Sequence, residues 1–399
     1  MRQKHVSMIL FIALFLTALC TIPVISAKFT PEDRLLFENR SLEPAPEWSW
    51  DGILSGSYYS QQECYLCDRA AGRTTLLKGK TWCDLNLFHR PVVNDVVVTD
   101  PDILLAYNPY EAVDETAISE TAEAVAQDLA QLQSAVDSYG GTFLYVAVPA
   151  HYAYFEDLYP WYLSNRSEYT HWELSLFTAA LERQGVHFLD MGEVWEAEGH
   201  PARNMSCIDH HYTWAGAFDV YRHMMERLNV MNGGSLSILS EDDLTLCSLP
   251  NPLLGSRSRK LCDQWHSDET LQYVQLKTPI PYTRYDWNSD TPSAAELVTI
   301  PETDWESVFY GSYMGGDIGQ TILQTNRPEL PNALIFGDSF TNPLETIFYA
   351  SFDETRSLDL RSYEEMGLLA YIEAYQPDVV VCVRDYEQLL NTTGNGSIH

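Results

Sequence analysis

The stretch that decides the fold is LIFGDSFT, residues 334–341, in which an apolar run ends in Gly-Asp-Ser. Residues 333–336 predict a buried strand and residues 342–351 predict a helix. A serine between them lies at the carboxyl end of a strand, where open α/β sheets bind ligands. Gly337 gives the backbone room to turn, and the N–H of Ser339 can donate to a developing oxyanion. The alternative is a helix N-cap, for which Asp338 and Ser339 are common residues.

The same alternation of apolar strands and helices extends to both sides of this turn. Strands are predicted at residues 142–148, 186–191, 357–360 and 379–383, and helices at 115–139, 169–183, 214–228 and 363–375. Strands that alternate with helices in this way predict an α/β fold with a parallel sheet covered on both faces.

Three parts of the chain lack this pattern. Residues 28–110 are turn-rich and predict an irregular entry segment. Residues 232–330 are rich in Gly, Ser, Pro and acidic residues and predict an irregular insertion or a small β-rich subregion. Residues 391–399 predict a polar, frayed tail. No second group of regular elements follows the sheet pattern, so no appended binding domain is predicted.

The N-terminus has the features of an export signal. Arg2 and Lys4 precede an apolar run at residues 6–25, and small residues follow at a plausible cleavage point. Residues 1–27 therefore predict a signal peptide, although the run is also long enough for an uncleaved membrane anchor. The location predicted is secreted or extracytoplasmic. The formal charge of −32 argues against binding to nucleic acid, because nucleic-acid phosphates require a surface rich in Lys and Arg.

Cysteine usage is consistent with export. Cys382 falls in a predicted buried strand, where a thiol acts as a small hydrophobe. Of the eight cysteines, six remain once Cys382 and Cys20 in the signal are set aside, and an even number in an exported chain predicts disulfides. The favoured pairs are Cys247 with Cys262, and Cys83 with Cys64 or Cys67. The Cys64-x-x-Cys67 pair could instead be half of a zinc site, but no second such pair follows.

A second polar cluster, DHHYTW at residues 209–214, stands just before a predicted helix. A serine hydroxyl needs a neutral imidazole to take its proton, and the imidazole needs a carboxylate to fix its tautomer. Asp209 and His211 can supply these two groups to Ser339. The alternatives are a helix cap by Thr213 with incidental histidines, or a metal site built from Asp209, His210 and His211.

Together the two clusters resemble the DHHW proteins and the alginate O-acetyltransferase (AlgX/AlgJ-type) family, which are SGNH-hydrolase-like. Supporting stretches are residues 37–44, 68–69, 143–149 and 315–322. The resemblance spans roughly residues 28–390, the size of one domain. It implies a single SGNH-hydrolase-like catalytic domain with a parallel sheet flanked by helices. The chain order Asp, His, Ser is the reverse of that in simple GDSL esterases and fits the acetyltransferase branch.

The resemblance also implies residue roles. Ser339 would be the nucleophile, His211 the general base and then acid, and Asp209 the group that orients His211. Arg361 matches an Asp-Leu-Arg block and would hold the oxyanion or a sugar hydroxyl, or else only an ion pair with Asp359 or Glu364. Tyr212 stands where the family has Trp. The oxyanion or substrate-binding candidates are Gly337, Asp338, Arg361, His210 and Tyr212.

The activity implied is transfer of O-acetyl groups to an extracellular or cell-surface polysaccharide, with no cofactor and no metal. A membrane-bound O-acyltransferase would supply the acetyl group. Two alternatives stay open: a carbohydrate O-acetyl esterase with the same triad, and a non-catalytic polysaccharide-binding protein of the cell envelope.

Overall fold

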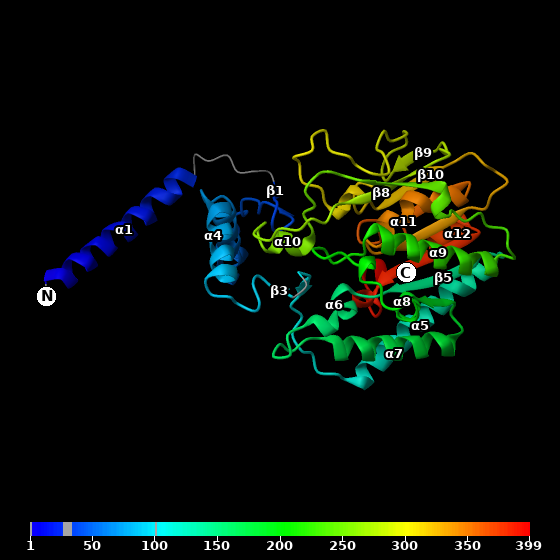
Figure 1. Ribbon diagram of the computed structural model, residues 1–399, viewed down its shortest axis with the longest axis horizontal. Coiled ribbons are helices and arrows are strands. Elements are labelled where there is room, and N and C mark those ends of the chain that lie inside the picture. Colours follow the sequence, from blue (N-terminus) through cyan, green and yellow to red (C-terminus); the bar gives the residue numbers. More distant parts are fainter. Residues whose placement is uncertain (1, 27–33, 100–101) are drawn as a thin grey trace. The chain divides into compact units, whose positions relative to one another are not determined.

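The computed structural model describes residues 2–26, 34–99 and 102–399, which form two compact units (Figure 1). The first unit comprises residues 1–96 and 258–266, and the second comprises residues 97–257 and 267–399. The single domain predicted over residues 28–390 is therefore divided, and both the Gly-Asp-Ser turn and the Asp-His loop belong to the second unit.

The first unit is helical. It contains α1 (Arg2–Ser26), α2 (Trp50–Ser55), α3 (Ser57–Asp68), α4 (Arg73–Asn86) and a small antiparallel pair, β1 (Arg34–Leu35) and β2 (Arg40–Ser41). None of the helices in the described segments combines the length and apolar composition that a bilayer crossing requires.

The turn-rich interpretation of residues 28–110 was wrong for α2, α3 and α4. Helix α2 buries no residue, α3 buries only Asp68, and α4 buries only Thr81 and Asp84. Because these helices bury no apolar stripe, the periodicity that identifies an amphipathic helix is absent from their sequence.

The second unit contains the predicted sheet. Seven strands lie in the order β6-β5-β13-β11-β12-β10-β9, and the first five run parallel. Their bounds are β5 (Thr142–Val148), β6 (Phe188–Asp190), β9 (Thr283–Asp286), β10 (Gln320–Gln324), β11 (Ala333–Gly337), β12 (Glu354–Leu358) and β13 (Val379–Asp385). Every residue of β11 and β13 is buried, which explains their continuous apolar runs. The predicted α/β fold is confirmed.

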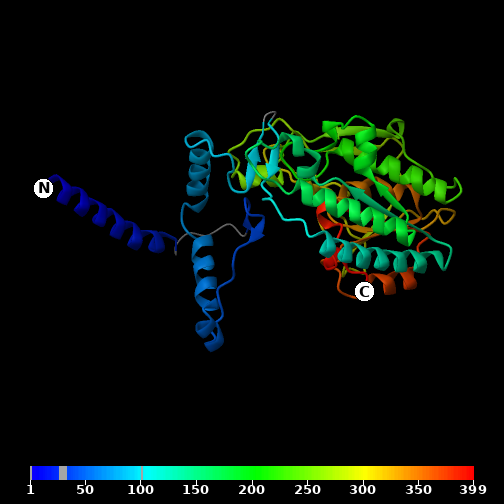
Figure 2. The ribbon, with the colours of Figure 1, turned by 90° about the horizontal axis from the view of Figure 1, so that it is seen from below.

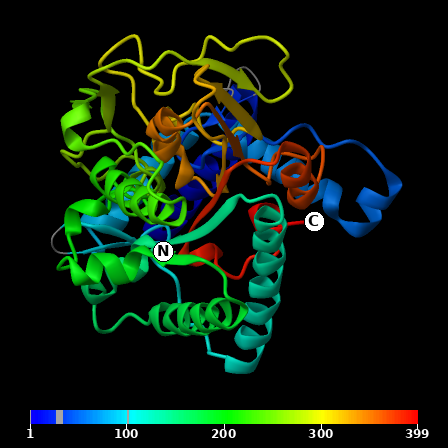
Figure 3. The ribbon, with the colours of Figure 1, turned by 90° about the vertical axis from the view of Figure 1, so that its right-hand side faces the viewer.

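Helices cover both faces of this sheet. One layer contains α5 (Glu115–Asp137), α7 (Ser167–Gln184) and α12 (Leu368–Tyr375), and α5 and α7 lie side by side (Figures 1 and 2). On the other side of β5 lie α9 (Trp214–Met231) and α11 (Thr341–Phe348) (Figure 3). Shorter elements are α6 (His151–Tyr154), α8 (Met191–Ala197), α10 (Ser256–Lys260), β3 (Val96–Val98) and β4 (Leu104–Ala106).

Residues 232–330 are more regular than predicted. Strands β9 and β10 extend the main sheet in antiparallel fashion, and β7 (Leu244–Ser248) pairs with β8 (Gln272–Leu276). Strand β10 alternates half-buried and buried positions, and β9 (TRYD) is largely polar. Short polar strands give little periodic signal, so the sequence located none of them individually, but the alternative of a small β-rich subregion is confirmed.

The C-terminal segment is not a frayed tail. Ile398 is buried, and its carbonyl accepts a hydrogen bond from the N–H of Leu369 (3.0 Å). Asn395 is also buried, and its side-chain oxygen accepts from the N–H of Leu360 (2.5 Å). Polar composition suggested disorder, but these polar groups form hydrogen bonds inside the fold.

The predicted disulfides are absent. All eight cysteines lie in the described part of the chain, and all are free thiols. Cys247 belongs to the second unit and Cys262 to the first, while Cys64 and Cys67 are exposed on α3. An even count of cysteines does not show which thiols come within bonding distance, so the pairing had no geometric support.

Candidate active site

The Gly-Asp-Ser turn follows β11, the middle strand of the sheet. A Cβ atom at Gly337 would lie 1.8 Å from the carbonyl oxygen of Val383, so glycine is needed for the close approach of β11 to β13. The Asp338 carboxylate accepts hydrogen bonds from the N–H groups of Phe340 and Asp385, both at 2.9 Å. Asp338 thereby ties the turn to β13 and fixes the position of Ser339.

The alternative role of Ser339 as a helix N-cap is not realised. Helix α11 begins at Thr341 with Phe340 as its cap residue, and no side chain caps it. The hydroxyl of Ser339 points instead to another partner, described below.

The loop that carries Asp209 is held from inside the fold. The Ser206 hydroxyl accepts from the N–H groups of Ile208 (3.2 Å) and Asp209 (2.9 Å). The Ser206 carbonyl lies 2.7 Å from Nε2 of His151. Burial lowers the pKa of His151 to about 3, so the ring is neutral and donates through Nε2–H. At the end of the loop, Thr213 caps α9, as one alternative predicted.

The structure brings the turn and the loop into contact. Ser339 Oγ lies 2.7 Å from Nε2 of His211. On the other side of the ring, Nδ1 of His211 lies 2.6 Å from Oδ1 of Asp209. Oδ2 of Asp209 accepts the N–H of Ser256 at 2.6 Å. The three residues predicted as a triad therefore form one continuous hydrogen-bonded chain.

The surroundings of His211 keep it neutral. The ring of Tyr310 stacks on the imidazole, with centroids 3.5 Å apart and planes 4° apart. Burial, with the neighbouring His210, lowers the pKa of His211 to about 4. Despite burial, the charges and hydrogen bonds of His211 and His210 hold the pKa of Asp209 well below its ordinary value. At neutral pH the site therefore contains a neutral base beside a carboxylate.

These pKa shifts predict the pH dependence of any reaction that needs His211 as a base. Protonated His211 cannot accept the Ser339 proton, so we expect kcat/KM for an acetyl ester to fall only as the pH drops through about 4. His210→Asn removes one of the groups that lower this pKa, and should move the acid limb to higher pH. Rates of ester hydrolysis across the acid range measure both. An acid limb that stays unmoved in the variant would contradict this assignment.

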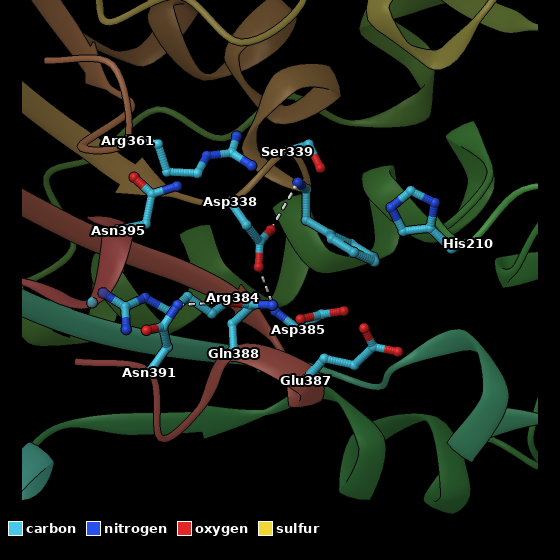
Figure 4. Close-up of a pocket in the computed structure, with 12 residues that line it drawn as sticks. His210, Asp338, Ser339, Arg361, Arg384, Asp385, Glu387, Gln388, Asn391 and Asn395 are labelled. Atoms are coloured by element: carbon cyan, nitrogen blue, oxygen red, sulfur yellow. Dashed lines mark hydrogen bonds between the residues drawn. The ribbon is translucent and has the colours of Figure 1, made fainter. Parts of the chain in front are cut away.

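A cavity of about 320 Å³ opens beside Ser339. Figure 4 shows Arg361, Asn395 and Asn391 on one side of Ser339 and His210 on the other. The lining residues are almost all polar: His210, Asp338, Ser339, Phe340, Arg361, Arg384, Asp385, Glu387, Gln388, Asn391, Asn395 and Gly396.

Both interpretations of Arg361 find support. Its guanidinium pairs with Asp359 (2.6 Å) and with Asp317 (2.7 Å), so it is held by two carboxylates. Glu364, the other partner considered, has no recorded ion pair with Arg361 among the described residues. Arg361 also lines the cavity beside Ser339, where its remaining N–H groups are positioned to meet a ligand.

Tyr212, an oxyanion or substrate-binding candidate, does not line this cavity. Its ring is buried, and its hydroxyl donates to the carbonyl of Phe340, next to Ser339. Its ring also packs edge-on against Phe340. Tyr212 therefore braces the turn, and it is not among the residues that line the cavity beside Ser339, so its role as an oxyanion or substrate-binding residue finds no support there. His210, by contrast, does line the cavity, with Nδ1 2.8 Å from the Ser256 hydroxyl.

Several site residues were missed in the sequence. Ser256 supports Asp209, Tyr310 covers His211, and Arg384, Asp385 and Asn395 line the cavity. Ser256, Tyr310 and Asn395 lie in segments predicted as irregular, where no local pattern marks them. Arg384 and Asp385 carried a signal: two charged residues directly after the predicted buried strand, at the edge where ligands bind.

The metal alternative fits less well. Ligand atoms of Asp209, His210 and His211 lie within 4.8 Å of one another. However, the two ring nitrogens of His211 are already directed at Asp209 and Ser339. A second cluster of Glu198, Asp219 and His223 is bridged by the guanidinium of Arg222, which supplies its positive charge.

No family model matches the sequence, and no curated protein matches it. Solved structures do. PatB1 from Bacillus cereus with a sulfonyl adduct shares 22% identity and a TM-score of 0.61, over 74% of this chain and 96% of that one. A DHHW family protein from Eubacterium siraeum shares 18% identity and a TM-score of 0.56, over 75% and 93%. In its fold, the chain is thus similar to the DHHW proteins that its sequence resembles.

Proposed function

We propose that the protein is an exported serine O-acetyltransferase that moves acetyl groups onto an extracellular or cell-surface polysaccharide. The observation that carries this proposal is the chain from Ser339 Oγ to His211 Nε2 (2.7 Å) and from His211 Nδ1 to Asp209 (2.6 Å), at the edge of a polar cavity. A serine, a neutral imidazole and a buried carboxylate in this order are the parts of a nucleophilic acyl-transfer site.

In the first half-reaction, His211 Nε2 takes the Ser339 hydroxyl proton while Oγ attacks the acetyl carbonyl of the donor. The tetrahedral intermediate collapses, the bond to the leaving group breaks, and His211 returns its proton to that group. The product is an acetyl ester on Ser339. Asp209 stays ionised and holds the imidazole in the tautomer that leaves Nε2 free to accept.

The second half-reaction reverses these roles. A sugar hydroxyl loses its proton to His211 and attacks the acetyl-Ser339 carbonyl, so the acetyl group leaves on the sugar and Ser339 regains the proton. Arg361 and the N–H of Ser339 are the candidates to stabilise the oxyanion. With water in place of the sugar, the same steps describe a carbohydrate O-acetyl esterase, the second candidate.

The N-terminus and the lining of the cavity also support the proposal. The N-terminal apolar run of residues 6–25 supports export, and a membrane-bound O-acyltransferase partner would deliver the acetyl group. The polar lining, with Gln388, Asn391 and Asn395, supports a hydroxyl-rich acceptor. PatB1 was solved with a sulfonyl adduct, and we propose that a sulfonyl fluoride likewise reacts with Ser339 in this chain.

Transfer and hydrolysis can be separated with one assay. Purified protein is incubated with a chromogenic acetyl ester, with and without oligosaccharides. We expect faster chromophore release in the presence of the acceptor, with an acetylated oligosaccharide found by mass spectrometry. If release is unaffected by any oligosaccharide and free acetate is the sole product, the esterase interpretation replaces the transferase one.

A further inference from the structure

Three buried polar atoms without a hydrogen-bond partner in the described structure belong to residues that line the cavity beside Ser339. They are Nε of Arg384, Oδ1 of Asp385 and Nδ2 of Asn395. These residues are 2%, 6% and 7% exposed. A buried donor or acceptor left without a partner is unfavourable, and native structures rarely retain one without a reason. The concentration of three such atoms in one cavity points to a ligand.

Asn395 is held in place for such a role. Its Oδ1 accepts from the N–H of Leu360, which leaves Nδ2 as the free end of the amide (Figure 4). The segment around it is tightly packed: a Cβ atom at Gly396 would lie 1.8 Å from the carbonyl oxygen of Asn391. The amide is therefore positioned before any ligand arrives, which favours binding.

The charges around the cavity argue against an acidic ligand. Arg361 is already paired with Asp317 and Asp359. Arg384 is the other cation of the lining, and it is accompanied there by the carboxyl groups of Asp338, Asp385 and Glu387. A carboxylate or phosphate on the ligand would lie beside these three carboxyl groups, which is unfavourable. A sugar hydroxyl, in contrast, both accepts and donates, as two donors and one acceptor require.

The cavity volume of about 320 Å³ is at the small end of the range for ligand pockets, roughly 300–1,000 Å³. It therefore suits one sugar residue rather than a long stretch of polymer.

Resting on the proposed function, we propose that Arg384, Asp385 and Asn395 form the acceptor subsite and bind hydroxyl groups of an uncharged sugar residue, a hexose or N-acetylhexosamine, in preference to a uronic acid. This subsite indicates the substrate class, a polymer that places an uncharged sugar residue next to Ser339.

Binding to the full chain carrying Ser339→Ala tests this preference without turnover. Isothermal titration calorimetry would compare an N-acetylglucosamine trisaccharide, a glucose trisaccharide and a galacturonic acid trisaccharide. We expect at least one neutral trisaccharide to bind at least about tenfold more tightly than the uronide, the effect of one lost hydrogen bond or one unfavourable charge contact. Tighter binding of the uronide, or no binding of any of the three, would overturn the proposal.

Two further variants in the same background locate the site. Asn395→Asp keeps the oxygen that accepts from Leu360 but replaces the free donor with an acceptor. Arg384→Met removes the buried Nε–H donor and keeps an unbranched side chain of similar length, and thermal melting checks that the variant folds. Each should weaken binding of the neutral trisaccharide by about tenfold. The matched control is Asn229→Asp on α9, whose Oδ1 likewise accepts a backbone N–H, from Leu236 (2.9 Å).

Unchanged binding in both subsite variants, with thermal melting that shows folded protein, would refute the assignment. Ester hydrolysis by the wild-type protein separates this outcome from failure of the proposed function. Hydrolysis without sugar binding contradicts only the subsite. Sugar binding by a protein that neither hydrolyses acetyl esters nor reacts with a sulfonyl fluoride contradicts only the enzymatic role.

Discussion

Ser339→Ala should lower kcat/KM for a small acetyl ester by at least about 10³-fold. The variant keeps the turn, since Gly337 and the two hydrogen bonds to the Asp338 carboxylate do not involve the Ser339 hydroxyl. It removes only the oxygen that lies 2.7 Å from Nε2 of His211 and that would become the acetyl ester. The remaining rate would come from water attacking a substrate that the cavity still binds. The assay is chromophore release, together with labelling by a sulfonyl fluoride probe, which should mark the wild type and not the variant.

The control is Ser134→Ala, which removes an exposed hydroxyl on α5 that donates only to the carbonyl of Ala130. It should keep the wild-type rate and the probe labelling. If Ser339→Ala retains full ester turnover, the serine is not the nucleophile. If the wild type shows no turnover and no labelling but binds oligosaccharides, the third interpretation, a non-catalytic polysaccharide-binding protein, is the correct one.

The parts of the fold that could be predicted are those whose burial pattern is visible within a single segment of the sequence. Strands β5, β11 and β13 are buried along nearly their whole length and appear in the sequence as unbroken apolar runs. Helix α5 buries Val125, Leu129, Leu132 and Val136 on one stripe, so its period is visible. A serine directly after β11 must then lie at the edge of the sheet where ligands bind, whatever the distant segments do.

The contact of Ser339 with His211 was a different kind of inference. The two residues are 128 positions apart, and nothing in either segment alone fixes their distance. The contact could be predicted because one segment supplies the serine and the other the histidine and aspartate of a catalytic triad, and the family that the sequence resembles combines the two. Ser256 and Tyr310 had no such partner pattern: one contributes a backbone N–H and the other the face of a ring, and any residue type or many aromatic residues could do the same.

The C-terminal segment shows the limit of composition as a guide. Asn391, Asn395 and Gly396 suggested a solvated tail, yet they line the cavity beside Ser339. Polar residues are disordered when they have no partners, but here Asn395 bonds to the backbone of Leu360 and Gly396 allows a contact with Asn391 that a side chain would block. The partners lie far away in sequence, so only the tertiary structure distinguishes this segment from a frayed end.

Asp209→Asn should lower kcat/KM by about 10⁴-fold, although it changes the shape of the side chain very little. Oδ1 of Asp209 accepts from Nδ1 and the backbone N–H of His211, and Oδ2 accepts from the N–H of Ser256. An amide has only one oxygen. Whichever way it is turned, its NH₂ group faces either the donors of His211 or the donor of Ser256, and two donors repel.

The substitution changes the tautomer of the His211 imidazole. If the amide oxygen keeps its hydrogen bond with the N–H of Ser256, the NH₂ group faces Nδ1 of His211. Nδ1 must then accept a hydrogen bond, so the ring proton moves to Nε2. Nε2–H then points at the Ser339 hydroxyl and cannot take its proton. The matched control is Asp353→Asn, since Asp353 accepts the backbone N–H of Arg327 (2.6 Å) outside this site and should leave the rate intact. A loss below about tenfold in Asp209→Asn would mean that Asp209 does not orient the base, because the wrong tautomer alone removes far more.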